Sequence, residues 1–240
     1  MGAGRPRAAA PSLRGGVVSE GASEPLSPGL PPTGRSPAPI PVDDGSLASP
    51  LGRAATIMLA GLLVLWAVEL ANAASARELA QAGGIRPRDP GSLIDIATSP
   101  FLHSSLEHLA GNAVALFSLG FIAALAGLKR FALVTLTVIV VGGFGVWLFS
   151  PANTVSVGAS GLVFGYFGYL LVRGLVDRRP VDLVVSIGVA LSYGYVMWNS
   201  VGFGTTGISW QGHVSGFVGG VVAALLFRDR RPKAVASTPT

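Results

Sequence analysis

The sequence predicts an all-α, polytopic membrane protein with six transmembrane helices. Half of its 240 residues are hydrophobic and only 12% are charged, which is too apolar for an ordinary soluble domain. From residue 54 onward, charged residues separate apolar blocks, and each block supplies close to the roughly 20 residues that a helix needs to cross a bilayer core. We therefore expect a membrane domain over residues 51–230.

Both ends of the chain are expected to be cytoplasmic tails. Residues 1–50 are rich in Pro, Gly, Ser and Ala and contain no long apolar stretch, so they predict a disordered tail that buries too little surface to fold alone. Residues 231–240 are expected to form a second, short cytoplasmic tail.

Six apolar blocks define the expected helices. They are residues 54–74, 106–127, 131–149, 158–176, 182–200 and 212–227. Two of the divisions fall inside long uncharged runs, where we place turns at residues 150–153 and at the glycine-rich stretch 202–207. The connection of residues 75–105 contains an apolar stretch, 93–97, which is either a short interfacial helix or part of a solvated loop.

The basic residues predict the orientation in the membrane. With six spans and both termini on one side, most Lys and Arg residues gather on that side, which the positive-inside rule makes the cytoplasm. Their placement between apolar blocks, rather than on one folded face, argues against a nucleic-acid partner. We expect a multi-pass protein of the plasma (inner) membrane, and the Ala, Gly and Arg content suggests a bacterial source.

Ser160 and His213 are the strongest candidates for chemistry, because polar groups at membrane depth are costly and mark sites by default. Ser160 lies 13 residues before Arg173, about 20 Å along a helix, and His213 lies 15 residues before Arg228, about 22 Å. The hydroxyl and the imidazole are therefore expected at the same depth on the fourth and sixth helices.

His108 and Asn112 are expected at a similar level on the second helix. Asn112 lies 17 residues before Lys129, about 25 Å, and His108 lies one turn further out on the same helix face. Taken singly, Asn112 is better explained by packing and His108 by hydration. Together with Ser160 and His213 they predict one site.

Glycines surround both candidate residues and are expected to let the two helices approach closely. Ser160 lies in a Gly-Ala-Ser-Gly run that begins at Gly158, and the close-packing glycines are expected to be Gly161, Gly216 and Gly220. The alternative is that these glycines, and Ser160 itself, serve packing alone.

A serine hydroxyl becomes a nucleophile when a base takes its proton, and His213 is the imidazole placed to do so. No Asp or Glu lies near His213 in the sequence, which predicts a Ser-His dyad rather than a triad. His108, Asn112 and Gly158, with the free N–H groups that begin the fourth helix, are the expected oxyanion-binding and substrate-positioning groups. The chain contains no cysteine, which excludes thiolate metal sites and cysteine nucleophiles.

Three segments resemble the signatures of the rhomboid intramembrane serine proteases, in the same order. They are residues 103–112, with two histidines five apart and an Asn four after the second, residues 158–161, and residues 212–220 around His213. The resemblance covers roughly residues 54–230. It implies a rhomboid-like fold, Ser160 as nucleophile, His213 as general base and oxyanion donors that include the Ser160 amide. It also implies that transmembrane segments are the substrates and that they are cleaved near the outer membrane face without metal or cofactor.

Other residues extend or limit this resemblance. Phe164 falls where family members pack an aromatic ring on the catalytic histidine, although an ordinary core residue fits equally. The Trp-Arg pair of many rhomboid first loops is absent, with Arg86 or Arg88 as the nearest basic residues, and Lys129-Arg130 follows the second helix in place of the usual acidic residue. Glu69 reaches the same outer band and is interpreted as structural rather than hydrated.

Two other functions compete with proteolysis. The first is a catalytically inactive rhomboid-like protein that binds transmembrane segments, and the second is a small transporter, which would need more ionisable residues at depth than His213. The expected partners are transmembrane protein substrates and the lipid bilayer, and the sequence sets no oligomeric state.

Overall fold

The computed structural model describes residues 49–229, and these form helices joined by short connections. The predicted tails, residues 1–50 and 231–240, lie outside the described residues, except that Ser49 and Pro50 begin the first helix. In the part of the chain that is described there is no strand, only an isolated bridge between Ile85 and Ser156. The helices are α1 (Pro50–Ala74), α2 (Glu78–Gly83), α3 (Asp95–Thr98), α4 (Leu106–Ala124), α5 (Leu128–Phe149), α6 (Ser160–Asp177), α7 (Pro180–Asn199) and α8 (Trp210–Leu226), with short 3₁₀ turns η1 (Pro90–Ile94) and η2 (Ser99–Phe101).

The six long helices match the expected spans within four residues at every end. α1 begins earlier than predicted because Ser49 caps it, its Oγ accepting from Gly52 N–H at 2.9 Å, and Pro50 takes the first helical position. α6 begins two residues later than predicted because Gly158 adopts φ +129°, outside the helical region.

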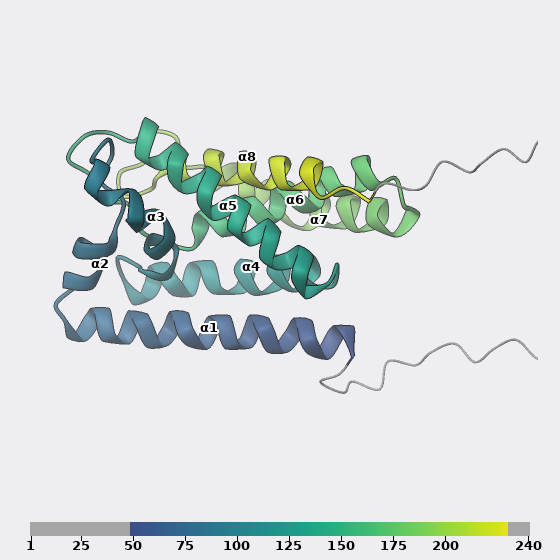
Figure 1. The fold of residues 1–240 in the computed structure, drawn as a ribbon, viewed down its shortest axis with the longest axis horizontal. Helices are drawn as coiled ribbons and strands as arrows, with labels where there is room; N and C mark the ends of the chain where they lie inside the picture. Colours follow the sequence, from purple (N-terminus) through teal and green to yellow (C-terminus); the bar gives the residue numbers. More distant parts are fainter. Residues whose placement is uncertain (1–48, 230–240) are drawn as a thin grey trace, which may run out of the picture. The chain divides into compact units, whose positions relative to one another are not determined.

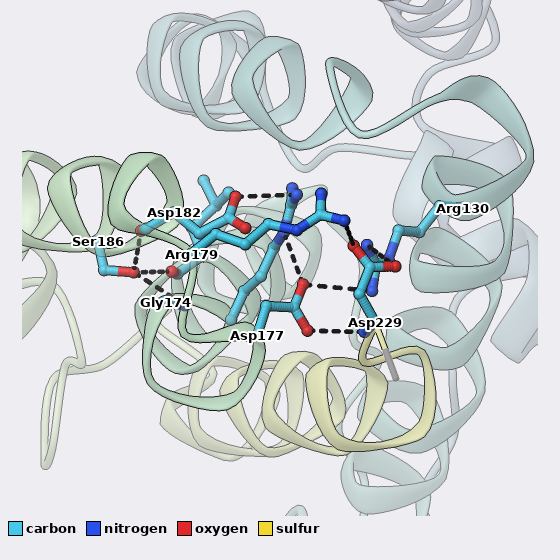
Figure 2. A network of polar contacts seen from close by, with 9 residues as sticks. Arg130, Gly174, Asp177, Arg179, Asp182, Ser186 and Asp229 are labelled. Atoms are coloured by element: carbon cyan, nitrogen blue, oxygen red, sulfur yellow. Dashed lines mark hydrogen bonds and ion pairs between the residues drawn. The ribbon is translucent and has the colours of Figure 1, made fainter. Parts of the chain in front are cut away.

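α6 is the central helix. Residues 163–170 are all buried, and α6 packs against α4, α5, α7 and α8. α8 lies along both α5 and α6, while α1 packs on α4, as Figure 1 shows. Ser186 joins α7 to α6, because its Oγ accepts from Gly174 N–H at 3.1 Å (Figure 2).

Four described helices, α1, α4, α5 and α7, are long and apolar enough to cross a membrane, and α8 is a shorter apolar helix of 17 residues. Leu63 is 72% exposed, Val114 75% and Leu191 81%, a cost in water that disappears in hydrocarbon. The fold is thus that of an all-helical, multi-pass membrane protein. Six crossings remain a prediction, since α6 and α8 are not among the four.

The connection between α1 and α4 is helical rather than an open loop. η1 and α3 cover residues 90–98, so the short-helix alternative for residues 93–97 agrees with the structure. Arg88 ties this connection to the end of α5 by donating to Leu148 O at 3.1 Å and to Ser150 O at 2.8 Å. Trp147 of α5 donates back to Asp89 O at 2.9 Å, so the two segments clasp each other.

A cluster of charges joins four helices at the end of α6 that is opposite Ser160 (Figure 2). The buried Asp177 contacts Arg130 of α5 and Arg173 of its own helix, each at 3.4 Å, and accepts from Asp229 N–H at 2.8 Å. Asp229 also pairs with Arg130 at 3.2 Å and with Arg179, just before α7, at 3.1 Å. Each buried charge therefore has a partner, which a low-dielectric interior requires.

Candidate active site

Ser160 is the first residue of α6 and follows a tight turn. Gly158 has φ +129°, a conformation that disfavours any residue with a Cβ. The ring of His108 lies against Gly158, since a Cβ there would fall 2.8 Å from His108 Cε1. The glycine thus allows both the sharp entry into α6 and the approach of the α4 imidazole.

Backbone bonds to the α1–α4 connection hold this turn from one side. Ile85 and Ser156 exchange two N–H···O bonds of 3.0 Å. Gly158 N–H donates to Ser99 O at 3.0 Å. The segment that leads into Ser160 is therefore fixed by residues more than 55 positions away in the chain.

His213 lies in the first turn and a half of α8 and is oriented by two contacts. Its Nδ1 lies 3.1 Å from Val201 O, and its ring stacks on Phe164 with centroids 4.3 Å apart and planes inclined by 9°. Because a carbonyl only accepts, Nδ1 carries the hydrogen in this bond. The neutral ring therefore keeps its lone pair on Nε2, and a backbone carbonyl occupies the place that an acid takes in a triad.

Glycines hold α6 and α8 in backbone contact below these side chains. A Cβ on Gly216 would lie 2.9 Å from the carbonyl carbon of Gly161, and one on Gly220 would lie 2.8 Å from that of Gly165. A Cβ on Gly161 would meet Gly212 O at an ordinary 3.6 Å, so at this position the backbone, rather than the missing side chain, forms the close contact. The spacing of the two helices depends most on Gly216 and Gly220.

One cavity of about 980 Å³ brings the four candidate polar residues together. Ser160, His213, His108 and Asn112 all line it. Within the described residues no hydrogen bond joins Ser160 to His213, a bond that often tightens only when substrate is present. Gly158 lies beside this cavity, in contact with the His108 ring.

The side chains of His108 and Asn112 are each held by a local bond. His108 Nδ1 lies 3.0 Å from Ser104 Oγ, and Asn112 Nδ2 donates to His108 O at 3.1 Å. The Nε2 atom of His108 faces Gly158 and takes no part in the bond to Ser104. Asn112 Nδ2 carries two hydrogens, and its bond to His108 O uses one of them.

Glu69 belongs to a buried network behind the site, which agrees with its structural interpretation. It is fully buried, forms an ion pair with Arg77, and accepts from Asn72 Nδ2 at 3.2 Å. The same Asn72 amide donates to His103 O at 2.9 Å, and Asn72 Oδ1 accepts from Ala80 N–H at 3.0 Å. The end of α1 is thereby tied to the segment that enters α4.

Among residues 49–229 no group of three or more His, Cys, Asp or Glu side chains is arranged to hold a metal ion.

Helices and cavity together define an all-helical membrane protein with a polar site between its helices. The rhomboid domain matches residues 90–230. An uncharacterized protein of Mycobacterium tuberculosis is 39% identical over 188 residues, 75% of this chain and 78% of that protein. An uncharacterized protein of Mycobacterium leprae is 37% identical over 194 residues, 76% of each chain. The Rhomboid protease GluP of Bacillus subtilis is 33% identical over 136 residues, which cover 54% of this chain and 25% of that protein.

The chain belongs to the rhomboid family. Its relatives in mycobacteria agree with the bacterial source suggested by composition.

The contacts of two groups at the site were not predicted from the sequence. Val201 O is a backbone atom, and any residue in that connection supplies one, so no sequence signal exists for it. His103 was visible as the first histidine of the five-apart pair, but its contact was not. Its Nε2 accepts from Ala159 N–H at 3.2 Å, immediately before Ser160.

Proposed function

We propose that the protein is an intramembrane serine endopeptidase that cleaves transmembrane segments near the outer membrane face through a Ser160–His213 dyad. The observation that supports this most is the placement of both side chains on one cavity wall, on helices whose glycines keep their backbones in contact. Val201 O adds support, because it fixes the His213 tautomer that a general base needs.

In the proposed reaction, His213 Nε2 takes the Ser160 Oγ proton as Oγ bonds to the scissile carbonyl carbon. The carbonyl electron pair moves to oxygen, and the negative charge is met by N–H donors. When the C–N bond breaks, His213 returns the proton to the leaving amine, and a water molecule then repeats both steps on the acyl ester.

The oxyanion donors in this proposal are the Ser160 N–H, His108 Nε2 and Asn112 Nδ2. The first N–H groups of a helix have no intrahelical acceptor, so the Ser160 amide is available. With the Ser104 hydroxyl donating to Nδ1, His108 carries its hydrogen on Nε2, on the side of Gly158. Such preorganised donors contribute about 10²- to 10³-fold each to kcat.

The proposed topology follows the charges. Six crossings by α1 and α4–α8 place the Arg130–Asp177 end in the cytoplasm with both termini, and the Ser160 end near the outer face of the plasma membrane. The substrates are then transmembrane proteins that reach the cavity from the bilayer.

The test uses the full chain in liposomes with a model transmembrane substrate and a fluorophosphonate probe. We expect cleavage that resists chelator and probe labelling that disappears in Ser160→Ala. Cleavage should fall by about 10⁴-fold or more in Ser160→Ala and in His213→Ala. Thr56→Ala, a control on α1 whose exposed hydroxyl donates to Gly52 O at 2.8 Å, should keep both labelling and cleavage.

Cleavage by Ser160→Ala at the wild-type rate would refute the serine mechanism. A wild type that binds a transmembrane segment and neither cleaves it nor reacts with the probe would instead identify an inactive relative.

A further inference from the structure

His103 is a buried imidazole that the proposed reaction does not use. It is fully buried in the short connection between η2 and α4, and it does not line the cavity. Its ring meets the His108 ring edge-on, with centroids 5.2 Å apart. His103 therefore contacts His108, a candidate oxyanion donor, from the side away from the cavity.

The side chain of His103 bonds the turn that presents Ser160. Its Nε2 accepts from Ala159 N–H at 3.2 Å, so the ring nitrogen is unprotonated and the hydrogen lies on Nδ1. Burial, reinforced by the positive charge that His108 acquires on protonation and opposed by Glu69, lowers the pKa of His103 to about 4. At neutral pH the acceptor is therefore permanently present.

The backbone of His103 is held from the opposite side. Asn72 Nδ2 donates to His103 O at 2.9 Å, and Arg77, paired with Glu69, donates to the same carbonyl at 3.5 Å. A ring anchored in this way has a fixed position against Ala159. Within the described residues His103 Nδ1 has no hydrogen-bond partner. The ring is therefore oriented so that Nε2 bonds to Ala159, while Nδ1 is left without a bond.

The peptide that His103 grips lies directly before the proposed nucleophile. Gly158 N–H is held by Ser99 O and Ala159 N–H by His103, which fixes two consecutive peptide planes. The next N–H belongs to Ser160. Its direction follows from the plane before it together with the φ of −76° and ψ of −3° at Ala159, because a residue has only these two soft dihedrals.

We infer that His103 is a positioning residue that aims the Ser160 amide and hydroxyl by holding Ala159 N–H, and that it reserves the Ser160 N–H as the backbone oxyanion donor. This inference rests on the proposed function. It assigns Ala159 N–H to the scaffold rather than to the oxyanion site.

The test compares two amide substitutions that differ in reach. His103→Gln places an oxygen close to the position of the lost Nε2, whereas His103→Asn places its amide near the Nδ1 position, too short for Ala159. Leu119→Ala, which truncates a fully buried side chain deeper in α4, controls for loss of stability alone. Each variant is assayed as full chain in liposomes for kcat, KM and melting temperature.

We expect His103→Asn to lower kcat by about 10- to 100-fold with KM changed less than about 3-fold, because His103 does not line the cavity. His103→Gln should recover kcat to within about 5-fold of wild type. Leu119→Ala should melt earlier with kcat nearly unchanged.

Equal kcat for the Gln and Asn variants in a preparation whose wild type cleaves would overturn this inference alone. A loss that follows melting temperature across all three variants would overturn it as well. A wild type without Ser160-dependent labelling would overturn the proposed function, and this inference with it.

Discussion

Gly216→Ala tests whether the spacing of α6 and α8 sets the proposed chemistry. Gly216 lies between two backbones, with its Cα 3.3 Å from where a Cβ on Gly142 of α5 would lie and with Gly161 of α6 on its other side. An added methyl would sit 2.9 Å from the Gly161 carbonyl carbon and closer still to its oxygen. No flexible side chain lies there to move aside, so the helices themselves must separate.

The size of the effect follows from that distance. Carbon atoms in contact prefer about 3.5 to 4.0 Å, so the methyl requires a separation of roughly 1 Å. A displacement of that size between reacting groups costs about 10²-fold in rate, and overpacking costs about 1 to 3 kcal/mol of stability. We therefore expect kcat for a transmembrane substrate to fall by about 100-fold.

The assay is substrate cleavage in liposomes, with melting temperature measured on the same preparations. Gly61→Ala on α1 and Gly188→Ala on α7 are matched controls, because a Cβ at either position meets no heavy atom within 4 Å. Both should keep wild-type kcat. A Gly216→Ala protein with wild-type kcat, or controls that lose as much, would refute the role of helix spacing.

Three further outcomes follow from other contacts. Gly158→Ala should lose about 1 to 3 kcal/mol of stability as well as activity, because φ is +129° and its Cβ would meet the His108 ring; unchanged melting would contradict this. Asp177→Asn should unfold more easily by about 3 kcal/mol in denaturant, since it leaves Arg130 without a buried carboxylate, and an unchanged midpoint would argue against the ion pairs. The pKa of His103, lowered from 6.5 to about 4, means that the unfolded chain binds more protons between these values. The contribution of neutral His103 to the free energy of unfolding is therefore complete above pH 6.5, and up to about 3 kcal/mol of that free energy is lost as the pH falls to 4. If the stability of His103→Gln falls with pH as steeply as that of the wild type, His103 is not the group responsible.

Most helix bounds were predictable because crossing a bilayer requires long apolar runs and charges interrupt those runs, while turn residues marked the two divisions that fall inside uncharged runs. The start of α6 was not, since it depends on the φ of Gly158, which the His108 ring and Ser99 O determine from other elements. The short helices of residues 75–105 were likewise only one of two alternatives, because their bonds, such as that of Arg88 to Ser150 O, join segments about 60 residues apart.

Much of the site was predictable from depth. Counting residues from the charged helix ends placed Ser160, His213, His108 and Asn112 at one level, and all four line the same cavity. Their roles in catalysis stay a prediction. What sequence could not supply is the set of backbone partners, because the groups that orient imidazoles, such as Val201 O, exist at every residue.

The bonds around residues 156–159 imply an order of assembly. Their partners, Ile85, Ser99 and His103, are synthesised more than 50 residues earlier and belong to a connection that also clasps α5. During synthesis this connection leaves the ribosome before the turn does, so its partner groups are available when the turn emerges. In the proposed enzyme, Ser160 lacks its reactive geometry until residues 156–159 have bonded to these partners. Protease activity therefore arises only when the fold is complete.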